Sequence, residues 1–197
     1  MGSGRPRFGA KNGMKTPMVR TLRGLVAGAT LLLLIACAPS SKNEQQYWDN
    51  HNKAVAEFSV KWPAYKGLLA AKQAKAKPLW DEASKVGDEK QKAEKMKAAN
   101  EALHDGLLSK LDEIKYKSKS VEDTIGKLNA LKLPKSKDGT RDEAVRSAQS
   151  TLNGVSAALA TAPASEEAAV ALLSEQISKL ITAGSNADRA LKALKGK

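Results

Sequence analysis

The sequence predicts an all-α protein, an elongated up-and-down bundle of four to six helices that pack like coiled coils. Ala, Glu, Lys, Leu and Arg make up about half of residues 38–197, a composition typical of long helices. Aliphatic and aromatic residues recur at steps of three and four over most of this range, which places them on one face of each helix. We therefore expect a single helical domain over residues 44–197.

An aromatic-rich segment over residues 43–86 opens this domain. Pro63 and Pro78 interrupt it, and a proline inside a helix either kinks that helix or begins a new one. The predicted helices span 43–62, 63–76 and 78–86, with fusion across a kink left open. Their apolar stripe consists of Trp48, Val55, Phe58, Trp62, Tyr65, Leu69, Leu79 and Val86. Because the aromatic residues follow this stripe, we expect them in the core rather than in an interface with a membrane or partner.

The next segment, residues 89–132, is predicted to be one long helix or two. Its stripe consists of Met96, Leu103, Leu107, Leu111, Ile114, Val121, Ile125 and Leu128. The sequence Ser-Val-Glu-Asp at 120–123 could begin a second helix as a capping signature, whereas the unbroken phase favours continuity.

Two further helices are predicted over 140–161 and 165–195. Pro134, Asp138 and Gly139 indicate a turn before the first of them, and Thr140 with Glu143 has the spacing of a capping box. The two stripes consist of Val145, Ala148, Leu152, Val155 and Leu159, and of Val170, Leu173, Ile177, Leu180, Ala187, Leu191 and Leu194.

Residues 1–36 have the pattern of a secretory signal peptide. The first 23 residues contain six basic residues and no acidic one, and a mostly apolar run of 13 residues follows from Gly24 to Ala36. A helix needs roughly 20 apolar residues to cross a bilayer, so this run is too short to span one. A start at Met14 or Met18 would shorten the basic region.

The end of this apolar run resembles the lipobox of bacterial lipoproteins. The matching residues are Leu34, Ile35, Ala36 and Cys37. The resemblance implies cleavage before Cys37, a diacylglyceryl group on its sulfur, and an acyl chain such as palmitate on the new amine. Cleavage by ordinary signal peptidase before Pro39 is disfavoured, because proline there blocks that enzyme. The remaining alternative is an uncleaved apolar anchor.

The resemblance also implies where the protein lies. Two or more acyl chains hold a protein stably on a membrane, so residues 37–43 would form a lipidated tether. We expect an extracytoplasmic, membrane-anchored protein, and in a diderm bacterium one in the outer membrane facing the periplasm, because Ala38 rather than Asp follows Cys37. Cys37 is the only cysteine, so no disulfide is expected despite a permissive compartment.

The charge of the chain argues against nucleic acid as a partner. The whole chain has a net charge of +12, and removing the six basic residues before Gly24 leaves 27 Lys and Arg against 21 Asp and Glu, or +6. Lysine dominates, and it is a compact hydrated charge rather than the planar fork used to bind phosphate or bases. Anionic lipids or wall polymers remain candidate partners, although a solvated helical surface explains the same charges.

The sequence contains no arrangement typical of an enzyme. Glu101 and His104 have the helical spacing of half a di-iron site, but no second copy of that motif occurs. No phosphate-binding glycine loop, nucleophile elbow or haem-attachment motif is present either. We expect no enzyme activity, cofactor or metal, and we expect His104 to face solvent.

Three functional hypotheses follow. The first is a membrane-tethered envelope lipoprotein with a helical domain that binds an envelope protein or has a structural role. The second is a periplasmic holdase-like chaperone, because Lys-rich amphipathic helices resemble in composition the arms of such chaperones. The third is a structural lipoprotein linked to peptidoglycan through Lys197, by analogy with the murein lipoprotein. A homo-oligomer also stays open, because heptad stripes can close within one chain or between chains.

Overall fold

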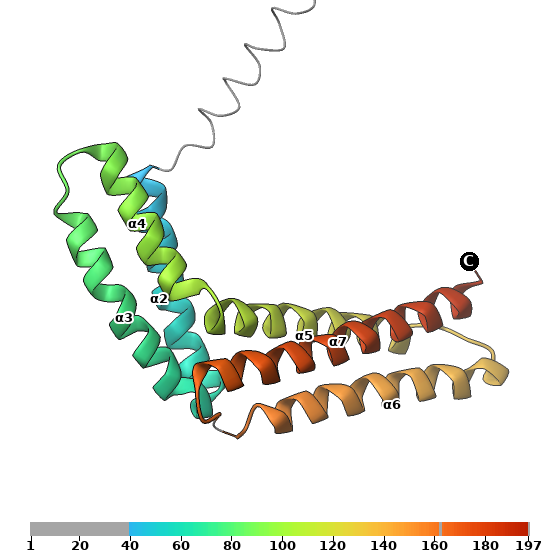
Figure 1. Cartoon of the computed structure of the whole chain (residues 1–197). Coiled ribbons are helices and arrows are strands. Elements are labelled where there is room, and N and C mark those ends of the chain that lie inside the picture. The colour runs from blue at the N-terminus through green and yellow to red at the C-terminus, as the bar shows by residue number, and fades with distance from the viewer. Residues whose placement is uncertain (1–39, 162, 197) are drawn as a thin grey trace, which may run out of the picture. The chain divides into compact units, whose positions relative to one another are not determined.

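The computed structural model describes residues 40–161 and 163–196, which belong to one compact unit over residues 39–197. Within the described ranges the chain forms six α-helices and one short 3-10 helix, with no strand. The predicted all-α helical bundle is therefore confirmed. Figure 1 shows two groups of three helices, in each of which consecutive helices run side by side in opposite directions. We call α2, α3 and α4 the N-terminal set and α5, α6 and α7 the C-terminal set.

Helix α2 (Ser41–Lys61) begins with a side-chain cap. The Ser40 hydroxyl accepts a hydrogen bond from the Asn43 backbone N–H at 3.3 Å, which satisfies one of the amides left free at a helix start. Helical structure thus begins at Ser41, and the predicted tether of 37–43 is too long at its C-terminal end.

Helix α2 ends at Lys61 because a proline follows two residues later. Pro63 disfavours helical geometry at the residue before it, and Trp62 has φ −129° and ψ 77°. The proline then begins the 3-10 helix η1 (Pro63–Tyr65), where its missing N–H is not needed.

Helix α3 (Lys66–Ser84) continues through Pro78, so of the two alternatives left open, separate helices over 63–76 and 78–86 or fusion at the proline, the structure shows fusion. Pro78 is solvent-exposed, and one missing backbone hydrogen bond on the exposed side does not end a helix whose other face is packed. Because the helical phase is kept, Trp80 is buried and Leu79 is 44% exposed. The expectation that Leu79 continues the apolar stripe is therefore wrong.

The predicted segment 89–132 consists of two helices, α4 (Glu89–His104) and α5 (Leu107–Asn129). The break lies at Asp105 and Gly106, not at the suggested capping signature 120–123, which is inside α5. Gly106 has φ +76°, a conformation that glycine adopts without the steric cost of a Cβ.

Helices α6 (Lys135–Ala158) and α7 (Glu166–Lys195) complete the C-terminal set. Helix α6 begins five residues before the predicted Thr140, with Pro134 in extended geometry at its start, so Thr140 is a residue within α6 and not its cap. The first residue of α7 follows Ser165, whose hydroxyl accepts from the Ala168 backbone N–H at 3.2 Å.

One hydrophobic core runs through both sets. Its largest fully buried side chains are Phe58, Tyr65, Leu69, Leu103, Leu107, Leu108, Leu111, Ile114, Val121, Leu128, Leu173 and Leu180. The sets also contact each other directly, because α2 and α4 both pack against α5. An ion pair adds to this junction: Lys72 Nζ of α3 lies 2.7 Å from Glu166 Oε1 of α7.

Candidate functional site

The predicted lipobox residues Leu34, Ile35, Ala36 and Cys37 lie outside the described residues. Their separation from the helical domain along the sequence is short, because only residues 38–40 lie between Cys37 and the first residue of α2. In the described part of the chain, none of the helices combines the length and the apolarity needed to cross a bilayer.

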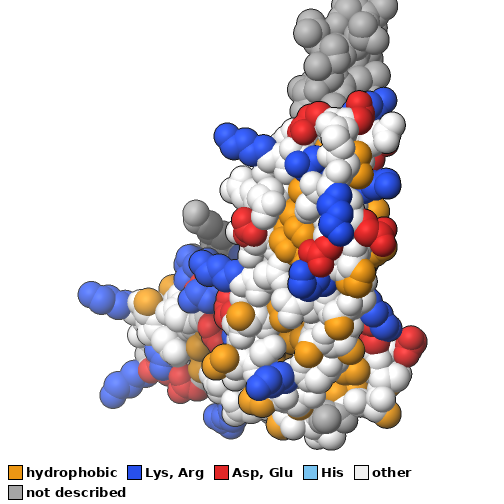
Figure 2. All heavy atoms as spheres, turned by 90° about the vertical axis from the view of Figure 1, so that its left-hand side faces the viewer, with side chains coloured by type: hydrophobic (Ala, Val, Ile, Leu, Met, Phe, Trp, Pro, Cys, Tyr) orange, Lys and Arg blue, Asp and Glu red, His pale blue; other side chains and the backbone are white. Residues whose placement is uncertain are grey.

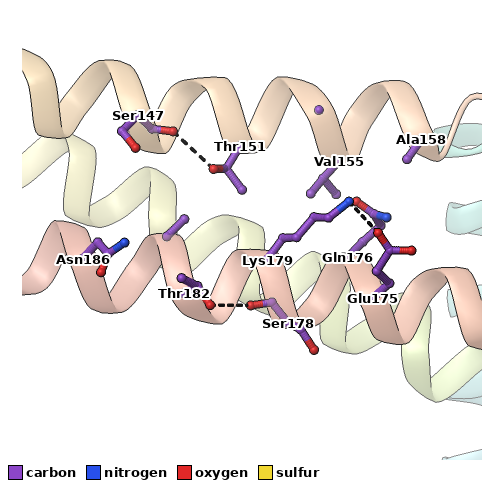
Figure 3. A pocket seen from close by; sticks show the side chains of 12 residues that line it. Ser147, Thr151, Val155, Ala158, Glu175, Gln176, Ser178, Lys179, Thr182 and Asn186 are labelled. Carbon is purple, nitrogen blue, oxygen red and sulfur yellow. Dashed lines mark hydrogen bonds and ion pairs between the residues drawn. The ribbon is translucent and has the colours of Figure 1, made fainter.

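A groove of about 510 Å³ runs between α6 and α7 (Figure 3). Most of its lining side chains are small: they are Ser147, Thr151, Gly154, Val155, Ala158, Ser178, Thr182 and Ala183, with Glu175, Gln176, Lys179 and Asn186 completing the lining. Small side chains keep the two helix backbones close to the open space. The groove therefore lets another backbone approach closely.

The hydroxyl groups of Thr151, Ser178 and Thr182 in the groove are already bonded within their own helices. Thr151 Oγ1 donates to the Ser147 carbonyl at 3.2 Å, and Thr182 Oγ1 donates to the Ser178 carbonyl at 3.0 Å. These bonds, visible as dashed lines in Figure 3, remove the need for water or ligand at the donors. The threonine methyl groups then give the groove much of its apolar character.

Two polar features lie at one end of the same groove. Gln176 of α7 is only 2% exposed although it lines the groove, and Lys179 Nζ lies 2.7 Å from Glu175 Oε1. Figure 3 shows these three side chains together, opposite Val155 of α6. The groove thus combines a long small-residue surface with a local group of amide and charged side chains.

A second, smaller cavity of about 180 Å³ lies between α2 and α4. At its wall Asn100 of α4 is 4% exposed, and its Nδ2 donates to the Glu44 carbonyl at 2.9 Å and to Glu44 Oε2 at 2.8 Å. Asn100 Oδ1 is buried without a hydrogen-bond partner among the described residues. Asn100 thus links α4 to α2 through its amide NH₂ group, while its amide oxygen is a buried acceptor without a partner. Such an acceptor costs free energy.

Both histidines line this cavity, and neither is simply solvent-facing. The rings of His51 (α2) and His104 (α4) stack with centroids 4.7 Å apart at 18°, and His51 Nδ1 is buried without a partner in the described part. The expected solvent-facing His104 is only partly exposed, because its ring stacks on that of His51. Burial first, and then the neighbouring His104, lower the pKa of His51, while the nearby side chain of Asn100 and the charge of Asp105 raise it.

Two carboxylates lie near the ring nitrogens of His104. Asp105 Oδ1 lies 3.8 Å from its Nδ1, and Asp112 Oδ2 of α5 lies 3.9 Å from its Nε2. Partial burial raises the pKa of Asp112, and the charges of His104 and Lys115 act in the opposite direction. The cavity therefore brings two imidazole rings close to carboxylate groups.

This arrangement does not form a metal centre. Over 40–161 and 163–196, no three His, Cys, Asp or Glu side chains are grouped as metal ligands. Stacked imidazole rings lie face to face, so their in-plane nitrogen lone pairs do not converge on one ion. Glu101 also lines the cavity, but its spacing to His104 is not accompanied by further converging carboxylates.

Sequence reasoning missed the two polar side chains that organise this cavity. His51 lies three residues after Trp48 and four before Val55, on the apolar stripe of α2, and Asn100 lies between Met96 and Leu103 on the stripe of α4. A polar residue within an apolar stripe is the signal that could have identified both.

Comparisons with known proteins give this chain no relative. No protein-family model matches it, and no curated protein or solved structure is significantly similar to it.

Proposed function

We propose that the chain is a membrane-tethered envelope lipoprotein whose helical domain binds a helix of another envelope protein in the groove between α6 and α7. The tether rests on the lipobox-like residues 34–37. The binding function rests on the groove, which is the observation that carries it. It is an open, mostly small-residue surface along two helices, and both of its threonine hydroxyls are already bonded.

The short link to α2 supports a closely held domain. From Cys37 to Ser41 an extended chain reaches at most about 14 Å, since each residue spans about 3.5 Å. Acyl chains on Cys37 would therefore keep the start of α2 within that distance of the lipid surface. In this proposal the partner is a protein of the same membrane or of the space next to it.

A helix suits the groove better than an extended peptide. An extended peptide gains affinity by pairing its backbone with a sheet edge, and the described residues contain no strand. A helix satisfies its own backbone, and it gains affinity by packing an apolar face against small side chains at close range. The small side chains of the groove permit that close contact, and the exposed Glu175 and Lys179 supply polar ones.

Crosslinking from the groove tests this proposal. A photoreactive amino acid at Ser178, in the full chain expressed in bacteria, is expected to capture one envelope protein in a saturable manner. Gly154→Trp should abolish the capture, because Gly154 lines the groove and a Cβ there meets open space. Gly139→Trp is the matched control, since Gly139 lies in the same helix but does not line the groove. Equal capture in all three proteins would contradict the proposed site.

The structure offers less support for the holdase alternative. A holdase needs a contiguous exposed apolar surface. The large exposed apolar side chains of the described part lie on four helices: they are Tyr47, Val60, Leu79, Tyr116 and Ile181. On the face shown in Figure 2, apolar side chains lie among basic and acidic ones. The peptidoglycan alternative depends on Lys197, which lies outside the described residues.

A further inference from the structure

The stacked histidines lie at the junction of the two helix sets. His104 is the last residue of α4, and two residues later Gly106 directs the chain into α5 with a positive φ. His51 belongs to α2, which packs on both α4 and α5. The stack therefore joins α2 to the one position where the chain passes from the N-terminal set into the C-terminal set.

Charged and polar groups from three elements face this pair. On α2, Glu44 and Tyr47 line the same cavity as His51; on α4 and its C-cap, Lys97, Asn100, Glu101 and Asp105 do so; and on α5, Asp112 faces His104. Asp112 is itself influenced by Lys115 of α5 and Glu57 of α2. The electrostatic field at the stack thus depends on contacts between α2, α4 and α5, which are the contacts that hold the junction.

The cavity can accommodate a proton on one of the two stacked rings. A protonated His104 has the carboxylates of Asp105 and Asp112 close to its two nitrogens. A protonated His51 would have a buried Nδ1–H, and the unpartnered acceptor Oδ1 of Asn100 belongs to the same cavity wall. Either proton can therefore be accommodated when the other ring is neutral.

Protonation of both stacked rings at once is unfavourable. Two imidazolium rings would place like charges face to face across a centroid distance of 4.7 Å, inside a partly buried cavity where water screens charge poorly. We propose that His51 and His104 form a proton-operated latch, which holds α2 on the α4–α5 junction while at most one ring is charged and releases it when both rings are charged.

The direction of the His51 pKa shift determines the pH range in which the latch opens. Burial and the neighbouring His104 lower the pKa of His51 in the folded state below its value in the unfolded chain. The folded state therefore binds fewer protons than the unfolded state, and the stability of the latched junction falls as the pH drops below about 6.5. This inference concerns the junction of the helices and is independent of what the α6–α7 groove binds.

Hydrogen exchange of the full chain tests the latch. Between pH 7.5 and 5.0, after correction for the intrinsic exchange rate, we expect protection of amides in α2 and α4 near the stack to fall as the pH drops below about 6.5. The fall should be at most about tenfold per pH unit, and it should level off once His51 is protonated in the folded state as well. In His51→Phe, which keeps an aromatic ring but cannot be charged, this pH-dependent loss should disappear. Amides in the middle of α6 and α7 serve as the internal control and should not change.

A second measurement keeps the test decisive if His51→Phe does not fold. NMR titration of the His51 ring in the unmodified chain should give a pKa below the ordinary histidine value of about 6.5. A His51 pKa at or above that value would overturn the proposal. Identical pH-dependent exchange in the unmodified chain and in His51→Phe would overturn it as well.

Discussion

The indole rings of Trp48 on α2 and Trp80 on α3 stack with their centroids 4.6 Å apart and an interplanar angle of only 6°. Both side chains are buried, and on α3 the buried residues on either side of Trp80 are the small Ala76 and Ala83. We infer that the stack is a main source of stability in the N-terminal set.

Trp80→Ala should destabilise the fold by about 3–5 kcal/mol, because it removes a buried aromatic side chain and leaves a cavity beside Trp48. Chemical denaturation followed by circular dichroism measures this difference. Leu79→Ala is the matched control: Leu79 precedes Trp80 but is exposed, and its replacement should change stability by less than about 1 kcal/mol. A similar loss in both variants would contradict the described orientation of α3.

Gly106→Ala should also destabilise the protein, by about 1–2 kcal/mol. Gly106 has φ +76°, where a Cβ is strained, and that Cβ would lie 3.3 Å from Glu166 Oε1. Gly126→Ala should instead stabilise by about 0.5–1 kcal/mol, since Gly126 lies inside α5 and a Cβ there meets nothing within 4 Å. Thermal unfolding of both variants decides the point, and a stabilising Gly106→Ala would refute the break between α4 and α5.

The Lys72–Glu166 ion pair should contribute more than ion pairs on the surface. Its atoms are 2.7 Å apart and the two side chains are only 12% and 28% exposed, whereas those of Lys77 and Asp81 are 64% and 47% exposed. A double-mutant cycle with Lys72→Met and Glu166→Gln should give a coupling energy of about 1–2 kcal/mol that persists in high salt. The same cycle on Lys77 and Asp81 should give about 0.5 kcal/mol or less. Equal coupling energies would mean that α3 and α7 do not meet as described.

Tyr65→Phe should stabilise the protein slightly, by up to about 1 kcal/mol. Tyr65 is fully buried, and its hydroxyl has no hydrogen-bond partner among the described residues, so removing it leaves no unpaired group. Burial also raises the pKa of Tyr65 in the folded state.

Because the pKa of Tyr65 is raised, the effect of Tyr65→Phe on stability should depend on pH. In the unfolded chain the phenol of Tyr65 ionises at about pH 10, whereas in the folded state it ionises only at a higher pH. The contribution of the neutral phenol to the free energy of unfolding is therefore present below pH 10 and is lost as the pH rises further. Denaturation curves between pH 8 and 11 should show a smaller alkaline loss in Tyr65→Phe. An equal loss in both proteins would place the Tyr65 hydroxyl in contact with water.

The sequence predicted the helical class and most core positions because amphipathic periodicity directly reports the buried face of a helix. It failed where local signals competed with packing. Pro78 suggested a break, but the burial of Trp80 keeps α3 continuous through it. Thr140 suggested a cap, yet α6 begins at Lys135 without a side-chain cap.

The candidate sites were harder to predict than the helices. The α6–α7 groove arises from two helices whose small residues become neighbours only in the packed fold, and Gly154 is an example. The stack of His51 on His104 joins residues that lie far apart in the sequence, and no single-helix pattern pairs them. Asn100 gave a readable signal as a polar residue on an apolar stripe, but its partner Glu44 did not.

The lipid tether is tested most directly by the intact mass and the membrane partition of the full chain expressed in a bacterium, compared with Cys37→Ala. We expect a mature protein that begins at Cys37, has the added mass of its acyl groups, and sediments with membranes. We also expect Cys37→Ala to lose both the acyl mass and the membrane association. A native protein that keeps residues before Gly24, together with a Cys37→Ala variant that still sediments with membranes, would contradict the lipid tether.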